Sequence, residues 1–115
     1  MWADIEKAFH TLELEEEDRE VTKFIWVKNT KKPISSQNIQ YLRFAEVPFG
    51  VISSPFLLSS TVRHHLEKCD DPVAKIAKEN SYVDNIFIGV ESATEAWLAY
   101  KRLKDIFKDA QMNLR

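Results

Sequence analysis

Residues 81–90, with the sequence SYVDNIFIGV, constrain the fold of this chain most. Two short runs rich in β-branched and aromatic residues flank Asp84 and Asn85. This pattern predicts a β-hairpin, although Asp-Asn is a weaker turn pair than Asp-Gly. The hairpin would place the Asp84 carboxylate at the tip of two antiparallel strands.

Two more segments have the composition of strands. Residues 21–27 (VTKFIWV) and 40–47 (QYLRFAEV) are rich in β-branched and aromatic residues, and the second alternates along its length. Between them, residues 29–38 are polar and contain Pro33 and two serines, which predicts a loop. The charge run at residues 15–20 is most simply a solvated helical turn or loop.

A helix start is marked at Ser53, Ser54 and Pro55. A serine cap followed by proline at the first helical position predicts a helix from Pro55 to His65 or Lys68.

Two further helices are predicted, over residues 72–78 and 93–110. The second has an apolar stripe at helical spacing, made of Ala93, Trp97, Tyr100, Leu103, Phe107 and Ala110. We expect its aromatic side chains in the core rather than in a base-stacking platform. The mixture predicts one α+β domain over residues 1–115, with a small antiparallel sheet and helices packed on one face.

The bulk properties exclude several classes of protein. Cys69 is the only cysteine, so an internal disulfide is impossible, which fits a reducing, intracellular setting. The charged N-terminal sequence is not a signal peptide, and no apolar run approaches the ~20 residues of a membrane span. The net charge is −2, whereas nucleic-acid-binding domains usually have a basic surplus. Either the basic surface lies elsewhere in a larger protein, or nucleic acid is not the partner.

Asp4 and Asp84 are the candidate catalytic carboxylates. Carboxylates at the ends of neighbouring strands can hold two divalent ions ~3.5–4 Å apart. Simpler interpretations also fit: Asp4 would cap a helix that begins with IEKAF, and Asp84 and Asn85 would form a plain turn, since both tolerate left-handed backbone. The residues alone favour these simpler interpretations.

Several motifs together resemble retroelement reverse transcriptases. ADIEKAF, VPFG with SSPFLLSST, and YVDN occur in the order and spacing of that family. The flanking text, DREVTKFIW, YLRFAEVPFGVISSPFLL and KDAQMNLR, looks most like the BEL/Pao group of retrotransposons. The resemblance spans nearly the whole chain and implies an incomplete polymerase palm.

The resemblance implies a metal site. Asp4 and Asp84 match the catalytic aspartates, and with Asn85 they would hold two Mg²⁺ or Mn²⁺ ions in a complete enzyme. Asn85 stands where most relatives have a second aspartate. An amide still offers a neutral oxygen, but one negative charge is lost, which puts activity in doubt.

The resemblance also implies substrate contacts. Phe9 matches the aromatic steric gate under the sugar of the incoming nucleotide. With it, the residues implied to bind the nucleotide are Phe49, Gly50 and Tyr82. Those implied to contact template and primer are Pro48, Ser53, Ser54 and Pro55. Arg115 is a candidate for a basic residue near the leaving pyrophosphate, but we expect it to be frayed as the final residue.

The implied activity is RNA-directed DNA polymerisation, in which a primer 3′-hydroxyl attacks the α-phosphate of a deoxynucleoside triphosphate. The implied partners are template–primer nucleic acid and the triphosphate, without a membrane, and the setting is a cytoplasmic retroelement particle. We expect fingers, thumb and ribonuclease H segments to be missing here, so that the isolated chain does not extend primers. The sequence does not indicate the oligomeric state. The alternative is an inactive retroelement remnant or a domesticated protein-interaction domain.

Overall fold

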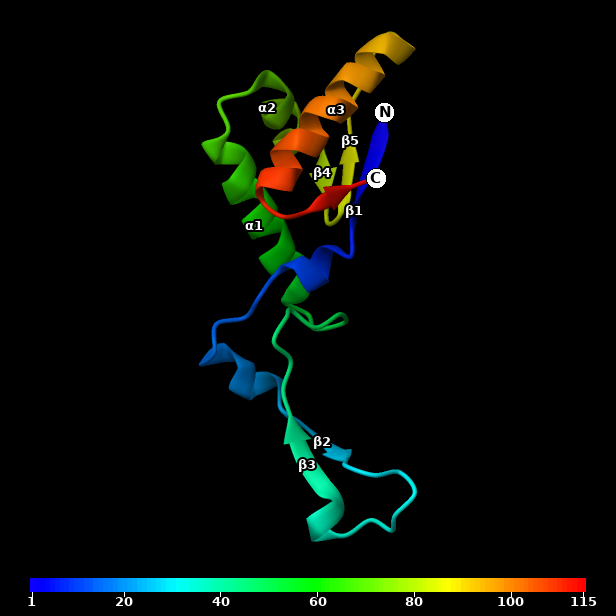
Figure 1. The fold of residues 1–115 in the computed structure, drawn as a ribbon. Coiled ribbons are helices and arrows are strands. Elements are labelled where there is room, and N and C mark those ends of the chain that lie inside the picture. Colours follow the sequence, from blue (N-terminus) through cyan, green and yellow to red (C-terminus); the bar gives the residue numbers. More distant parts are fainter.

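The computed structural model describes residues 1–115 as a helix-covered sheet from which a long arm extends (Figure 1). The three α-helices are α1 (Ser54–Lys68), α2 (Pro72–Glu79) and α3 (Ala93–Asp109). They cover one face of a four-stranded antiparallel sheet, while the other face stays open. The predicted α+β architecture is thus confirmed. None of the helices is long and apolar enough to cross a membrane.

The sheet has the strand order β4-β5-β1-β6. Its strands are β1 (Trp2–Glu6), β4 (Ser81–Tyr82), β5 (Asn85–Phe87) and β6 (Asn113–Leu114). The first and last segments of the chain thus lie side by side, and the predicted hairpin at residues 81–90 pairs with β1.

The core lies between this sheet and the helices. Side chains alternate along β1, so that Ala3 and Ile5 are buried while Trp2 is exposed on the open face. From the helices, the buried apolar residues recur at helical spacing: Leu58, Val62, Leu66, Ala74, Ala77, Leu103, Ile106 and Phe107. Burial of one face of each element therefore fixes the register of the sheet.

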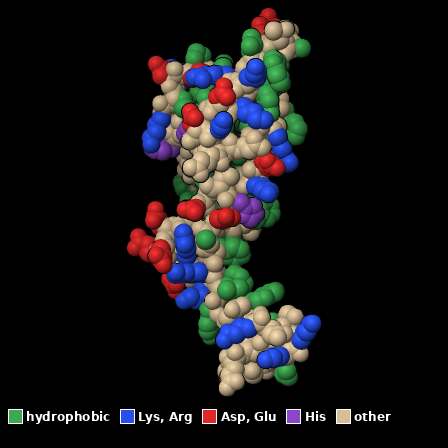
Figure 2. Space-filling view, viewed as in Figure 1, with side chains coloured by type: hydrophobic (Ala, Val, Ile, Leu, Met, Phe, Trp, Pro, Cys, Tyr) green, Lys and Arg blue, Asp and Glu red, His purple; other side chains and the backbone are tan.

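The arm comprises residues 13–46 and is closed at its base by a bridge between Glu13 and Glu46. It contains the 3₁₀ turns η2 (Asp18–Thr22) and η3 (Ser36–Asn38) and the strands β2 (Phe24–Val27) and β3 (Ile39–Leu42). These strands form a separate two-stranded sheet, and the molecule reaches 63 Å in its longest dimension. Figure 2 shows apolar side chains exposed along one face of the arm. Strand alternation turns exposed apolar side chains to both faces of the arm: Phe24, Ile25, Trp26, Tyr41, Leu42 and Phe44.

Three local predictions were wrong. Both strands of the arm are shorter than predicted, because η2 occupies the start of the first and β3 ends at Leu42. The helix that the simpler interpretation of Asp4 placed at IEKAF is absent, because residues 2–6 form β1 and the single 3₁₀ turn η1 (Ala8–Thr11) follows. Trp97 is not a core residue: 58% of its surface is exposed, because the first turns of α3 extend past the sheet.

Asp71 joins α2 to α3. Its Oδ1 accepts hydrogen bonds from the amides of Val73 and Ala74 and so caps α2. Its Oδ2 lies 2.6 Å from Nε of Arg102 on α3. The hydrogen bond from Arg102 and those from the backbone lower the pKa of Asp71.

We expect Asp71→Ala to lower the free energy of unfolding by about 1–2 kcal/mol, since the cap and the ion pair are both lost. Asp71→Asn keeps the cap and should cost less at neutral pH. Because the folded-state pKa is lowered, the stability due to the ion pair is present above about pH 4 and is lost as the pH falls through the lowered pKa. The difference in the free energy of unfolding between Asp71→Asn and the natural chain should therefore become smaller at low pH.

Urea denaturation at neutral pH and at about pH 3 measures this difference. Asp70→Asn is the matched control, because its ion pair with Lys75 is fully exposed on the Asp70 side and should contribute little. A deficit of Asp71→Asn that does not change with pH would contradict the assignment.

Candidate active site

Asp4 and Asp84 lie near each other where β1 pairs with the start of β5. Asp4 lies opposite Asn85 in the pairing of β1 with β5, and the Ile5 amide donates to the Asp84 carbonyl at 2.9 Å. Two carboxylates that are 80 positions apart in the chain are thus brought together by β1 and by the turn that leads into β5. The alternative that Asp4 caps a helix is wrong, because Asp4 is in the middle of a strand.

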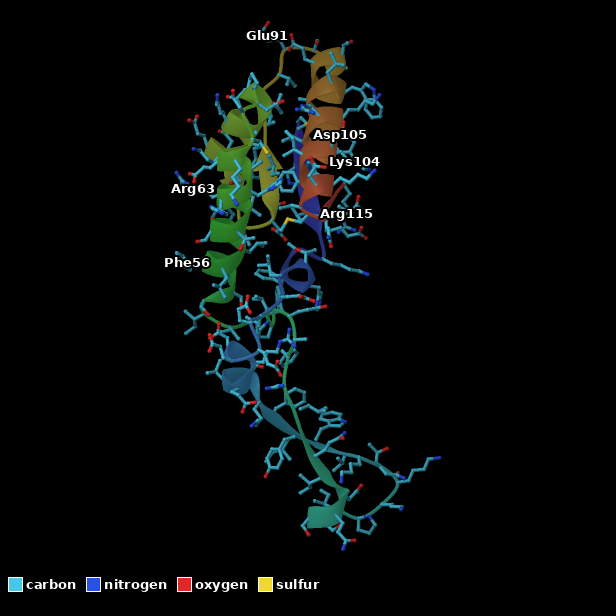
Figure 3. All side chains as sticks on the ribbon, turned by 60° about the vertical axis from the view of Figure 1, so that its left-hand side comes forward. Phe56, Arg63, Glu91, Lys104, Asp105 and Arg115 are labelled. Atoms are coloured by element: carbon cyan, nitrogen blue, oxygen red, sulfur yellow. The ribbon has the colours of Figure 1, made fainter.

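Arg115 lies on the other side of Asp4. The backbones of the two residues exchange hydrogen bonds of 2.8 and 2.9 Å, and Nε of Arg115 lies 2.7 Å from Oδ2 of Asp4. This hydrogen bond and the Asp4 charge raise the pKa of Arg115, which stays cationic. The expected fraying of Arg115 is wrong, because the backbone pairing with β1 extends through it (Figure 3).

Asp84 lies in the two-residue turn between β4 and β5. The left-handed residue of this turn is Val83, with φ 56°, rather than Asp84 or Asn85. Oδ1 of Asp84 accepts a hydrogen bond of 2.7 Å from Nδ2 of Asn85, and Oδ1 of Asn85 accepts one of 2.8 Å from the indole of Trp2. A β-branched residue with positive φ is strained, and such strain occurs mostly where surrounding structure enforces it.

A pocket of about 240 Å³ contains both carboxylates. Its lining includes Asp4, Asp84, Arg115, Phe9 and Phe49. Phe9 follows β1 in η1, and its ring meets Phe49 edge to face, with centroids 5.5 Å apart. Residues from four separate parts of the chain thus form a small pocket with an aromatic wall. We call it the acidic pocket after its two carboxylates, although the basic Lys7 and Arg115 also line it.

A second pocket, of about 760 Å³, lies beside the first and shares Phe49 with it. Pro48, Gly50, Ser53 and Ser54 line it. Gly50 has φ 89°, so this turn requires a residue without a side chain. The structure therefore places the predicted template–primer segment next to the acidic pocket.

The predicted serine cap, directly before Pro55, would be Ser54, but α1 begins at Ser54 itself. Ser53 takes the cap position with helical backbone (φ −79°, ψ −15°) and makes no side-chain cap hydrogen bond. Ser54 instead is buried, and its hydroxyl donates to the Pro48 carbonyl at 2.6 Å. Pro55 is in the first turn of α1, as predicted. Tyr82 pairs with Asn85 on the open face and is exposed, but it does not line either pocket.

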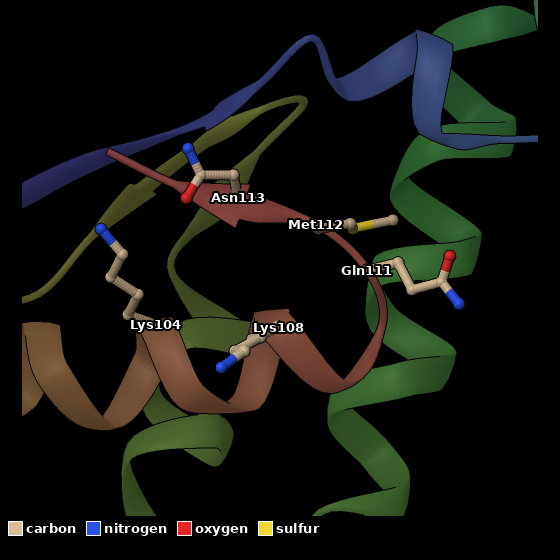
Figure 4. A pocket seen from close by; sticks show the side chains of 5 residues that line it. All are labelled: Lys104, Lys108, Gln111, Met112 and Asn113. Atoms are coloured by element: carbon tan, nitrogen blue, oxygen red, sulfur yellow. The ribbon is translucent and has the colours of Figure 1, made fainter.

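A third hollow, of about 430 Å³, lies between the end of α3 and β6 (Figure 4). It is lined by Lys104, Lys108, Gln111, Met112 and Asn113. Because it contains no carboxylate, it is not a cation site.

Comparison with known families agrees with this geometry. The family model described as reverse transcriptase (RNA-dependent DNA polymerase) matches residues 1–115. The chain belongs to the reverse transcriptase family. No curated protein matches the chain significantly.

Reverse transcriptases use divalent metals, and the donors present here fit such ions. Oδ1 of Asp4 and Oδ2 of Asp84 have no hydrogen bond from the protein. No group of three or more acidic, histidine or cysteine side chains is placed so that it could hold a metal ion by itself. Mg²⁺ commonly takes one or two carboxylates together with substrate phosphates, so two carboxylates with free oxygens are an adequate set.

The hydrogen bond of Trp2 to Asn85 beside Asp84 was not predicted from the sequence. Trp2 lies two residues before Asp4, and strand periodicity puts both side chains on the open face. That spacing was the available signal, but it needed β1 to be recognised as a strand.

Ser54→Ala should lower the free energy of unfolding by about 1–3 kcal/mol, because the Pro48 carbonyl would lose its buried partner. Ser53→Ala is the matched control and should change stability little, since its hydroxyl caps nothing. Chemical denaturation of both variants measures this. Equal effects of the two substitutions would contradict the assignment.

Proposed function

We propose that this chain is the catalytic palm of a reverse transcriptase and that Asp4 and Asp84 hold the divalent ions for nucleotidyl transfer. The observation that carries the proposal is that Asp4, on β1, and Asp84, in the turn before the paired strand β5, line one pocket. When bound, such ions would lower the pKa of the primer 3′-hydroxyl and stabilise the leaving oxygens.

The chain's own residues supply the orientation. Each carboxylate has one oxygen bound by a protein donor and one oxygen free. The bound oxygen fixes the rotation of the side chain, and the free one is available to a cation. A geometry set before substrate arrives lowers the entropy lost in the reaction.

Arg115 has two proposed roles. Without metal, its guanidinium neutralises Asp4. When a cation takes over Asp4, the guanidinium would be released into the same pocket, where triphosphate oxygens can accept its hydrogen bonds.

Phe9 and Phe49 are proposed to contact the nucleotide, with Gly50 and Tyr82, and the segment 48–55 to contact template and primer. The aromatic pair forms one wall of the acidic pocket, which supports this assignment. The far end of the arm supports a nucleic-acid partner as well: Lys28, Lys31 and Lys32 form no ion pair, whereas Lys23 and Arg43 are paired with Glu20 at its base. The net charge of −2 therefore hides a locally basic surface.

We expect Asp84→Asn to weaken Mn²⁺ binding by roughly tenfold or more, since one of two charged ligands is removed. Arg115→Gln should strengthen Mn²⁺ binding several-fold without nucleotide, because the cation competing for Asp4 is gone. The same variant should bind a deoxynucleoside triphosphate more weakly. Electron paramagnetic resonance of free Mn²⁺ measures the metal affinity of each variant. Calorimetric titration measures its affinity for the triphosphate.

Asp105→Asn and Lys108→Gln are charge-matched controls on α3, and neither should change Mn²⁺ binding. The proposal fails if Asp84→Asn binds Mn²⁺ as well as the natural chain does.

Phe9→Val should raise ribonucleotide incorporation relative to deoxynucleotide incorporation, because the ring is proposed to occupy the space of a 2′-hydroxyl. It should also lower the free energy of unfolding by roughly 1–4 kcal/mol, since Phe9 packs against the core. The incorporation ratio is measured in the longest reading frame that carries this chain. Phe87→Val is the control, because Phe87 is half-exposed on β5 and lines neither of the two pockets that share Phe49. If the ratio of ribonucleotide to deoxynucleotide incorporation is unchanged, Phe9 packs against the core and does not exclude the 2′-hydroxyl.

The finer assignment to the BEL/Pao group, in a cytoplasmic retroelement particle, is also a proposal. It is supported by the sequence resemblance alone. The exposed apolar faces of the arm favour a second candidate, a domesticated protein-interaction domain. The flanking genomic sequence distinguishes them: a frame continuing into protease and integrase supports the retroelement polymerase, and stop codons near both ends support the alternative.

A further inference from the structure

Three side chains on the open face of the sheet form a chain of hydrogen bonds. The indole Nε1 of Trp2 donates to Oδ1 of Asn85 at 2.8 Å, and Nδ2 of Asn85 donates to Oδ1 of Asp84 at 2.7 Å. The pairing of β1 with β5 puts Trp2 and Asn85 on the same face, so backbone register holds the three together.

The direction of this chain is fixed by chemistry. An indole N–H only donates, and an ionised carboxylate only accepts. The amide of Asn85 therefore satisfies both neighbours in one orientation alone, with its oxygen toward Trp2 and its nitrogen toward Asp84. By donating to Oδ1 of Asn85, Trp2 thus orients the amide so that its NH₂ group is directed at Asp84.

We infer that Asn85 is a positioning residue for Asp84 and that Trp2 sets its orientation. The inference rests on the proposed role of Asp84 as a metal ligand. Asn85 holds Oδ1 of Asp84, so that Oδ2 is the oxygen presented to a cation.

An aspartate at position 85 could not do this. It would still accept from Trp2, but its second oxygen would face the Asp84 carboxylate and repel it when no cation is present. Asn85 therefore does more than remove one negative charge from the site. In the absence of metal, its hydrogen bond to Asp84 stands where two carboxylates would repel each other.

Nitrogen–proton correlation spectra of the chain test the inference directly. In the natural chain, the Trp2 indole N–H should exchange with solvent more slowly than that of Trp97, which has no hydrogen-bond partner. Trp2→Phe should shift the side-chain amide signals of Asn85, and Trp97→Phe should not. Asn85→Asp should keep the slow exchange of Trp2, whereas Asn85→Leu should abolish it.

Mn²⁺ affinity is the second readout, because a purely structural role would not change it. Trp2→Phe leaves every charge in place, yet it should weaken Mn²⁺ binding by roughly tenfold, as is typical when a partner behind a metal ligand is removed. Trp97→Phe should leave the affinity unchanged. An Asn85 amide that does not respond to Trp2→Phe overturns the inference, and so does an unchanged Mn²⁺ affinity in Trp2→Phe. If the natural chain binds no Mn²⁺, the proposed function fails, and the amide signals still decide whether Trp2 orients Asn85.

Discussion

The antiparallel pairing of β1 with β5 and β6 is the constraint on which the site depends. It sets Asp4 opposite Asn85 on one side and opposite Arg115 on the other. Because side chains alternate, the same register that buries Ala3 and Ile5 turns Trp2 and Asp4 to the open face. A slip of one residue would expose the core and bury the carboxylate, so folding and site geometry are specified together.

The site shows how carboxylates are held near each other without a cation. Each has one dedicated donor: Arg115 for Asp4 and Asn85 for Asp84. One donor is charged and the other neutral, so the two aspartates are not equivalent. If a cation binds Asp4, the guanidinium of Arg115 has to leave that carboxylate, whereas Asn85 can keep its hydrogen bond to Asp84. Because reverse transcriptases act on anionic substrates, a released Arg115 guanidinium could bind substrate phosphate in the pocket that it lines with Asp4 and Asp84.

Periodicity and turn chemistry predicted much of the fold from the sequence. Pro55 and Pro72 marked two helices correctly, and the pattern around Asp84 predicted the hairpin. Periodicity could not show that residues 2–6 form a strand, because the text ADIEKAF also suits a helix, and pairing with β5 and β6 overrides that preference. The ion pair of Arg115 with Asp4 and the bond of Trp2 to Asn85 depend on long-range register, which no local pattern contains. The family resemblance pointed to Asp4 and Asp84, and the structure brings them together.

Paramagnetic broadening by Mn²⁺ would show whether Asp4 and Asp84 bind the cation, because it locates the ion on the chain. Backbone amide signals would be recorded during titration with Mn²⁺. The account predicts that broadening begins at Asp4, Ile5, Asp84 and Arg115, around the acidic pocket. Broadening centred on the acidic residues 15–18 of the arm, with the pocket unaffected, would show that the ion binds there and would contradict the account.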